Sequence, residues 1–249
     1  MSSILRLMMS TTFLCFAADR KRSMCARSTA TLAALASRAQ YRRSVHNAQL
    51  AVRGEATHIA LLKRFRPRQY PRSAVPAWVR HDGWISPHTG RLLFGSLSLR
   101  CALGKTGVTA QKREGDGATP IGAHRILTGL INPARIGGLL ANRQFWRPVG
   151  NADGWCDEPF HAAYNRPVRL PFSASHEKLM RRDHLYDRVL VLDWNITRRS
   201  HGRGSAIFFH QARTSAGRYL PTEGCIAIDA NDFRRLMGAL SRLKSITVL

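Results

Sequence analysis

Acidic residues are scarce in this sequence. The 249 residues include 15 Asp and Glu against 39 Lys and Arg, which gives a formal net charge of +24 at pH 7. Such a charge attracts anionic polymers and membrane surfaces, although an arginine bias spread over solvated faces would give the same total. The sequence also lacks a zinc finger, an RNA-recognition aromatic signature and a leucine-zipper heptad. We therefore expect no nucleic-acid partner.

Long apolar runs are absent as well. No segment reaches the roughly eighteen apolar residues that a membrane-spanning helix needs, so we expect no transmembrane segment. Residues 1–57 are rich in Ala, Ser and Arg and lack strand-like alternation. We interpret them as an extension outside the fold, disordered or helical, and as a candidate export leader. Its apolar stretches are Ile4–Ala18, which basic residues follow, and the short Thr29–Ala36, which ends in small residues typical of a cleavage site.

Cysteines are few and irregularly placed. The sequence holds five, an odd number, with no Cys-x-x-Cys pair, so neither a disulfide framework nor a zinc site is indicated. Cys101 and Cys156 would either pair in an oxidising compartment or serve as small buried residues, and the sequence leaves both open. We expect no metal site.

One stretch of the sequence carries the residues for covalent chemistry. A short apolar run, Ala206–Phe209, ends on His210, and after a polar loop Gly224 and Cys225 precede a second apolar run, Ile226–Ile228. Two such runs are typical of neighbouring strands, which would place His210 and Cys225 near each other. An imidazole beside a thiol takes its proton, and the imidazolium then lowers the thiol pKa. Gly224 allows a tight turn, so that N–H groups around Cys225 face an oxyanion.

A second motif lies upstream. The His–Cys spacing alone leaves open that Cys225 is only a small core residue. Residues 112–122, however, contain the turn Thr119-Pro120-Ile121-Gly122 ahead of a strand-like run. The two motifs together resemble those of the L,D-transpeptidase family (YkuD type), which joins a Thr-Pro-x-Gly turn to a strand-end His and a Ser/Thr-x-Gly-Cys-Ile/Val segment. The segments GWCDEPFHAAYNRPVRLP and DHLYDRVLVL resemble one bacterial branch of that family, so the resemblance covers residues 91–249.

The resemblance implies a mostly-β fold, an L,D-transpeptidase-type β-sandwich with one or two short helices, in a catalytic domain over residues 58–249. The hydrophobic pattern of the sequence also predicts several short strands. A helix capped by Asp229 is expected to run to about Leu243. The other predicted elements are a short helix at Ser175–Arg182 and strands within Arg91–Leu103, at His124–Leu130, at Tyr186–Trp194 and at Ser245–Leu249.

The resemblance also implies a cysteine-dependent transpeptidase that crosslinks peptidoglycan stem peptides, with a role in cell-wall biogenesis and cell shape. Cys225 would attack the third stem residue, release D-Ala and form a thioester, which an amine of a second stem resolves. His210 would act as general base and then as acid. The backbone N–H groups of Glu223, Gly224 and Cys225 would form the oxyanion hole. This role implies a periplasmic or cell-envelope location, and its chemistry would need neither a metal nor an organic cofactor.

Two other functions stay open. Water in place of the amine would make the chain an L,D-carboxypeptidase or another cysteine hydrolase of cell-wall peptides. A non-catalytic wall-binding module would keep the fold with Cys225 vestigial, but the presence of both His210 and Cys225 in their motif positions argues against it. No feature of the sequence indicates the oligomeric state.

Three positions depart from the family pattern. Gln211 follows the histidine where Gly or Ser is common, so the group that orients the imidazole is unassigned. Glu223 stands where His is frequent, and its carboxylate would raise the thiol pKa unless it points to solvent. Ala227 replaces an arginine that can bind a substrate carboxylate in the family, so another cation is needed.

Six residues are candidates for contacts with the substrate, and three of them are cations that would replace the missing arginine. The other three combine aromatic surface with hydrogen-bonding groups, which suits either a pocket wall or a structural loop anchored by the tryptophan. The six are Lys112, Arg113, Arg166, Trp155, Tyr164 and Asn165.

Overall fold

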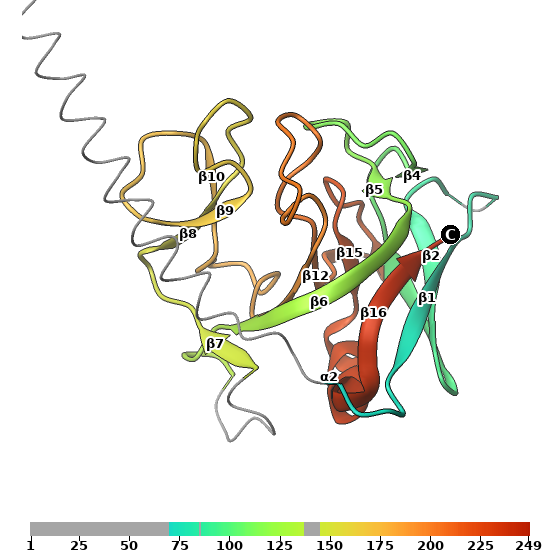
Figure 1. Ribbon diagram of the computed structural model, residues 1–249. Coiled ribbons are helices and arrows are strands. Elements are labelled where there is room, and N and C mark those ends of the chain that lie inside the picture. Colours follow the sequence, from blue (N-terminus) through green and yellow to red (C-terminus); the bar gives the residue numbers. More distant parts are fainter. Residues whose placement is uncertain (1–69, 85, 137–144) are drawn as a thin grey trace, which may run out of the picture. The chain divides into compact units, whose positions relative to one another are not determined.

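The computed structural model describes residues 70–84, 86–136 and 145–249, and the candidate leader at residues 1–57 lies outside them (Figure 1). The described residues form sixteen strands, one α-helix and one 3-10 turn, so the mostly-β prediction is confirmed. The main sheet contains β1 (Val75–His81), β2 (Thr89–Phe94), β3 (Leu97–Ala102), β6 (Gly122–Ile131), β7 (Trp146–Pro148), β11 (Arg188–Leu192), β12 (Phe208–Gln211), β15 (Ile226–Ile228) and β16 (Leu243–Val248). The remaining strands form small separate sheets. They are β4 (Val108–Thr109), β5 (Thr119–Pro120), β8 (Asp153–Cys156), β9 (Arg166–Arg169), β10 (His176–Lys178), β13 (Thr214–Ser215) and β14 (Arg218–Tyr219).

Strand β6 closes the main sheet. The nine strands follow the order β11-β12-β15-β3-β2-β1-β16-β6-β7, and β6 pairs with β11 as well. The first half of β6 pairs with β16, with Arg125 opposite Ser245, and the second half pairs with β11, with Leu130 opposite Val189. The sheet therefore curls back on itself, with β6 sweeping across the domain between its two partners (Figure 1).

Strand β11 is buried on both faces, as its continuous apolar sequence predicts. Leu190 and Leu192 join the large core cluster, to which the other strands of the closed sheet also contribute, whereas Val189 and Val191 join a second cluster on the opposite face. This second cluster also contains Cys225. One hydrophobic layer therefore supports both the central strand and the candidate nucleophile.

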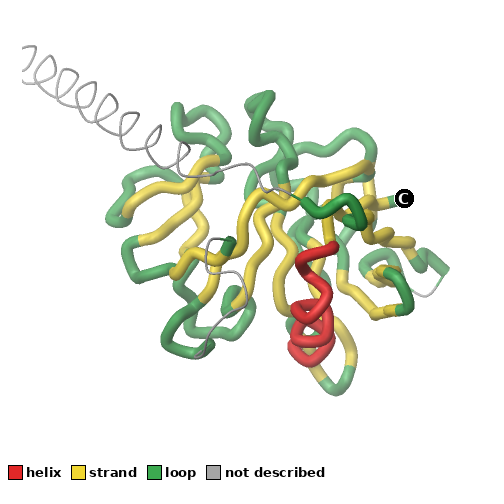
Figure 2. The backbone as a smooth tube through the Cα atoms, turned by 60° about the horizontal axis from the view of Figure 1, so that its bottom comes forward, coloured by secondary structure: helices red, strands yellow, loops and turns green. Residues whose placement is uncertain are grey.

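Helix α2 (Ala230–Ala239) follows the predicted cap. The Asp229 carboxylate accepts a hydrogen bond from the backbone N–H of Asn231 at 2.8 Å, which satisfies one of the free donors of the first turn. Phe233 and Leu236 anchor the helix in the core, and Figure 2 shows it in red against the strands. It ends before the predicted Leu243, because the chain must be extended there to enter β16. Within the described residues, no helix is long and apolar enough to cross a membrane.

Two predicted elements are wrong in detail. The alternation across residues 91–103 belongs to a hairpin of β2 and β3 rather than to one strand, because Gly95, at φ +56°, lies in the turn between them. The short helix expected at Ser175–Arg182 is not formed. Instead β10 pairs with β8, with Glu177 opposite Trp155, so bonds between strands satisfy its backbone.

A three-stranded sheet, β10-β8-β9, packs over the outer cluster of the main sheet. Trp155 of β8 meets Phe208 of β12 edge to face, with the ring centroids 5.2 Å apart. Tyr186, which precedes β11, makes the same kind of contact with Phe208 at 6.0 Å and with His210 at 5.2 Å. The small sheet therefore covers the face of β12 that carries His210.

Candidate active site

Two parallel strands bring the histidine and the cysteine together. Strands β12 and β15 pair in parallel, with Phe209 opposite Ile226 and His210 opposite Ala227. Cys225 immediately precedes β15, and its Sγ accepts a hydrogen bond from the backbone N–H of Phe208 at 3.3 Å. The predicted pairing of the two apolar runs is confirmed.

The Cys225 thiol is enclosed. The residue is 8% exposed, and the thiol donates to the carbonyl oxygen of Ala206 at 3.2 Å. Burial raises the pKa of Cys225 to about 12, and the hydrogen bond from Phe208 offsets this only in part. The resting side chain is therefore a protonated thiol.

The imidazole is held by the backbone of its own strand. His210 Nδ1 lies 2.7 Å from the carbonyl oxygen of Gln211, which can only accept, so Nδ1 carries the proton and Nε2 is the basic nitrogen. Burial lowers the pKa of His210 to about 4. The orienting group that the sequence left unassigned is a main-chain carbonyl, which residues of any type supply at this position.

The charges of this pair differ from the expected ion pair. A thiol pKa of about 12 and an imidazole pKa of about 4 keep both groups neutral between those values. Transfer of the thiol proton to the imidazole is thus unfavourable in this arrangement.

The two sequence motifs lie against each other at the cysteine. The carbonyl oxygen of Cys225 accepts a hydrogen bond from Thr222 Oγ1 at 2.7 Å and a longer one from Thr119 Oγ1 at 3.4 Å. Thr119 Oγ1 also accepts from the backbone N–H of Gly104 at 2.8 Å. The threonine of the Thr-Pro-x-Gly turn therefore links the backbone of Cys225 to that of Gly104.

Gly224 makes the turn that presents the cysteine. Its φ is +133°, and a Cβ atom there would lie 2.8 Å from the carbonyl oxygen of Ala118, so a side chain is excluded. The Gly224 N–H donates to Thr222 Oγ1 at 3.2 Å. Among the described residues, nothing accepts a hydrogen bond from the backbone N–H of Glu223 or Cys225.

The Glu223 carboxylate points away from the thiol. Its side chain is 78% exposed and forms an ion pair with Lys105 at 2.7 Å. The carboxylate whose charge does raise the Cys225 pKa, after burial, is Glu177 of β10. Burial also raises the pKa of Glu177. The sequence carries no signal for this residue, because Glu177 is 48 positions from the cysteine and belongs to neither motif.

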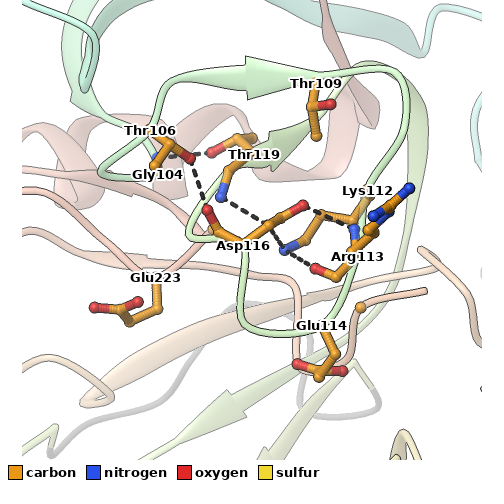
Figure 3. Close-up of polar contacts among 12 residues, drawn as sticks. Gly104, Thr106, Thr109, Lys112, Arg113, Glu114, Asp116, Thr119 and Glu223 are labelled. Carbon is orange, nitrogen blue, oxygen red and sulfur yellow. Dashed lines mark hydrogen bonds and ion pairs between the residues drawn. The ribbon is translucent and has the colours of Figure 1, made fainter. Parts of the chain in front are cut away.

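The loop between β4 and β5 is organised around Asp116 (Figure 3). Its carboxylate binds Lys112 Nζ and accepts from the backbone N–H groups of Arg113 at 2.7 Å and Ala118 at 2.9 Å. Lys112 is 2% exposed, and its charge lowers the Cys225 pKa, though less than burial raises it. Arg113 is exposed.

Residues 154–167 contain Asn165, whose side chain bonds the backbone of Ala206. Asn165 Oδ1 accepts from Trp155 Nε1 at 2.9 Å and from the Ala206 N–H at 3.1 Å. The Asn165 amide donates to the carbonyls of Trp194 and Asn195. The Ala206 carbonyl in turn accepts a hydrogen bond from the Cys225 thiol, so Asn165 positions the backbone that contacts Cys225.

The neighbours of Asn165 also have partners within the protein. The Tyr164 hydroxyl donates to Glu114, and its ring stacks on His201 with the centroids 5.9 Å apart. Arg166 is half-buried and donates to the carbonyl of Ile196 at 2.8 Å.

Three cysteines of the described chain are free and buried: Cys101, Cys156 and Cys225. Cys101 and Cys156 do not pair and so act as small buried residues. Within the described residues, no group of three or more His, Cys, Asp or Glu side chains is placed to hold a metal ion.

Two hollows lie near this region, and neither is lined by Cys225 or His210. One, of about 440 Å³, is lined by the start of β6 and by residues 193–203. The other, of about 1270 Å³, lies between residues 132–135, 151–152, 170–172 and 176–183. Met180 lines the larger hollow and packs against the hydrophobic cluster that includes Cys225.

Comparisons with known proteins identify the family of this chain. The family model of the L,D-transpeptidase catalytic domain (YkuD) matches residues 88–246. Among solved structures, the chain is similar to L,D-transpeptidase 1 of Mycobacterium tuberculosis, with 14% identity over 70% of this chain and 61% of that chain and a TM-score of 0.29. No curated protein matches. Because the family model spans well over half of the sequence, this chain belongs to the L,D-transpeptidase catalytic domain family.

Proposed function

We propose that the protein is a cysteine-dependent L,D-transpeptidase that forms peptidoglycan crosslinks through a thioester and releases D-Ala. One observation supports this most directly. In a chain of this family, His210 lies on the strand that pairs with β15, which begins directly after Cys225 at its tight turn. Its Nδ1 is held by the Gln211 carbonyl, and Nε2 makes no hydrogen bond to any of the described residues.

In the first step, His210 Nε2 takes the thiol proton while Cys225 Sγ bonds to the carbonyl carbon of the third stem residue. The thiol must leave the Ala206 carbonyl to do so. The N–H groups of Glu223 and Cys225 stabilise the oxyanion, and that of Gly224 keeps Thr222 in place. As the C–N bond breaks, the imidazolium gives its proton to the departing amine of D-Ala.

In the second step, the amine of another stem attacks the thioester. The amine proton passes to His210, and the cysteine leaves as a thiol once that proton returns to sulfur. The product is an amide crosslink, and the enzyme returns to its neutral resting state. Water as the acceptor gives the carboxypeptidase alternative with the same acyl-enzyme.

The six residues nominated for substrate contacts divide by burial. Lys112, Asn165 and Trp155 are buried and bonded within the protein, which favours a role in holding the cysteine loop. Tyr164 and Arg166 are bonded as well. Arg113 is the exposed member of the set, so we propose it as a contact on the acceptor or glycan side.

A crosslinking role places the protein in the periplasm or cell envelope. In this proposal residues 1–57 act in export and residues 58–249 form the catalytic domain. The large positive charge would favour binding to an anionic wall polymer.

The test compares the full chain with its Cys225→Ala variant on a disaccharide-tetrapeptide. D-Ala release by the parent alone, with an acyl adduct in the intact mass of the parent, is expected. Crosslinked dimer then identifies a transpeptidase, and tripeptide alone identifies the carboxypeptidase. Neither release nor adduct, from folded and reduced protein, would refute the proposal and leave another cysteine hydrolase or the non-catalytic module as alternatives.

A further inference from the structure

Three arginines lie side by side across strands β1, β2 and β3. Arg80 is directly opposite Arg91 in the β1–β2 pair, and Arg91 is directly opposite Arg100 in the β2–β3 pair. Residues directly opposite each other on neighbouring strands share a face, and the strands are about 5 Å apart, so the row spans roughly 10 Å. All three residues are exposed. We call this row the arginine ladder.

The ladder lies on the outer face of the closed sheet. The adjacent positions in the three strands, Val79, Leu92 and Leu99, form a second row that joins the hydrophobic core. Because side chains alternate between the two faces of a sheet, the arginines point away from that core. Figure 1 shows β1 and β2 at the opposite end of the view from the small sheet of β8, β9 and β10.

The charges of the ladder are not neutralised within the described part of the chain. None of the three arginines forms an ion pair there, and neither does the acid Asp82, which directly follows β1. Arg100 lies over the ring of Tyr219, 5.3 Å from its centroid. Like charges directly opposite each other destabilise a sheet, so an anion that lies across the ladder would stabilise it.

A row with apolar side chains runs beside the ladder on the same face. Trp78 of β1 is directly opposite Leu93 of β2, and each is two residues from an arginine of the ladder, so both belong to its face. Trp78 is 44% exposed, and Trp84, in the loop that joins β1 to β2, is fully exposed. Indole rings, which are apolar apart from one N–H group, are typical of the boundary between membrane and water. The face therefore presents cations and indoles together.

This combination distinguishes an anionic bilayer from a soluble anionic polymer. Phosphates of either partner would neutralise the arginines, but a bilayer also takes the indoles out of water. Each basic residue near an anionic leaflet adds to binding. Long arginine side chains keep their charge among the headgroups while their stems lie against apolar groups. The partner that fits this face best is therefore an anionic phospholipid surface.

We propose that the face formed by Arg80, Arg91, Arg100, Trp78 and Trp84 binds the protein peripherally to an anionic phospholipid bilayer. The catalytic pair takes no part in this contact, because β15 and β12 lie beyond β3 in the order of the sheet. Binding to the bilayer is therefore measured separately from D-Ala release, and it holds whichever reaction the enzyme catalyses.

The test measures the partition of the full chain onto vesicles of equimolar phosphatidylglycerol and phosphatidylcholine, and onto phosphatidylcholine alone. We expect binding to the anionic vesicles and little to the neutral ones. Arg80→Gln/Arg91→Gln should weaken the partition by about tenfold or more. The matched control Arg198→Gln/Arg203→Gln removes two exposed arginines of the chain after β11, which also lack ion pairs. It should weaken the partition less than about threefold, because salt screens charges that lie away from the contact.

A second readout locates the contact. Phosphatidylglycerol brominated in its acyl chains quenches the fluorescence of tryptophans that enter the bilayer, so Trp78→Phe/Trp84→Phe should remove most of the quenching. Trp194→Phe is the control and should keep it, since the indole N–H of Trp194 is bonded within the protein. Thermal melts should place Arg80→Gln/Arg91→Gln at or above the parent, because the change removes a repulsion between strands.

Three results with vesicles would overturn the proposal. They are no binding of the parent to anionic vesicles, equal weakening in both arginine variants, which would mean that binding follows total charge, and unchanged quenching in Trp78→Phe/Trp84→Phe, which would mean that another face meets the bilayer. Binding to soluble polyphosphate that depends on Arg80 and Arg91, with none to vesicles, would overturn it as well and would assign the face to an anionic polymer.

Discussion

His210 Nδ1 lies 2.7 Å from the carbonyl oxygen of Gln211, the next residue in the same strand. The contact sets the imidazole tautomer with a group that no side-chain substitution removes. The Gln211 side chain has another task, since its amide donates to the His184 carbonyl at 3.0 Å and ties the strand to the loop before β11. The backbone of Gln211 therefore orients the imidazole of His210, and its side chain attaches the strand to the neighbouring loop.

Gln211→Ala should therefore keep its activity. We expect kcat within about threefold of the parent, because the backbone carbonyl remains, and a loss of stability of about 1 kcal/mol for the missing amide bond. D-Ala release and chemical denaturation measure the two effects. His210→Gln is the control and should lose activity by more than about a hundredfold. A large loss of kcat in Gln211→Ala would show that the side chain itself orients the imidazole.

Thr119 tests the contact between the two motifs. Thr119→Val keeps the shape but removes the hydroxyl that bonds Gly104 and Cys225, so we expect about 1–3 kcal/mol lower stability and slower acylation. Thr119→Ser retains the hydroxyl and should acylate at nearly the parent rate. Intact-mass kinetics of adduct formation distinguish the two variants. Equal rates would mean that Thr119 holds the fold without affecting the cysteine.

Gly224→Ala should be far more damaging than Gly217→Ala. Both positions have positive φ, but a Cβ at Gly224 meets the Ala118 carbonyl at 2.8 Å, whereas nothing lies within 4 Å at Gly217. We expect about 1 kcal/mol of strain at Gly217 and at least about twice that at Gly224. Thermal melts and adduct formation provide the measurements. Similar costs at the two sites would indicate that the cysteine turn relaxes around a side chain.

The raised pKa of Cys225 predicts that its thiol reacts with alkylating agents mainly at alkaline pH. With the Cys225 pKa raised from 9.0 to about 12, its thiolate fraction at pH 8 is about a thousandfold below that of an exposed thiol. Alkylation by iodoacetamide, followed on the Cys225 peptide by mass spectrometry, should keep rising beyond pH 10. Cys225→Ala identifies the signal of the other four cysteines. A plateau near neutral pH would reveal a resting thiolate–imidazolium pair.

His210 predicts a loss of stability in acid. Its pKa is about 4 in the folded protein and 6.5 as the ordinary value, so the unfolded chain binds the proton more tightly. The free energy of unfolding is unaffected by this group above pH 6.5. It decreases as the pH falls from 6.5 towards 4, by up to ~3 kcal/mol. Denaturation across this range should show a weaker pH dependence in His210→Gln. An unchanged slope would assign the acid sensitivity to other groups.

The elements that sequence reasoning located are those with a long local pattern. The buried run in β11, the two runs in β12 and β15, and the Asp229 cap of α2 each contain their own signal. The pairing of β12 with β15 then places His210 near Cys225. By contrast, β10 is only His176–Lys178, and its identity as a strand depends on β8 rather than on its three residues.

The parts of the site that escaped prediction are made by distant segments. Glu177, Arg181 and Tyr186 approach the pair from β10 and the chain that follows it, and no motif spacing joins them to Cys225. The nominated Lys112 and Asn165 face inward, because each meets partners that only the folded loop supplies. The sequence shows that both side chains are polar. It does not show which atoms they bond, because those partners come from distant segments.

The closed sheet has a consequence for biosynthesis. Strand β16 lies between β1 and β6 and pairs with both, so the sheet stays open until residues 243–248 have left the ribosome. Those residues follow the histidine and the cysteine in the chain. His210 and Cys225 are therefore synthesised before the strand that closes the sheet around them.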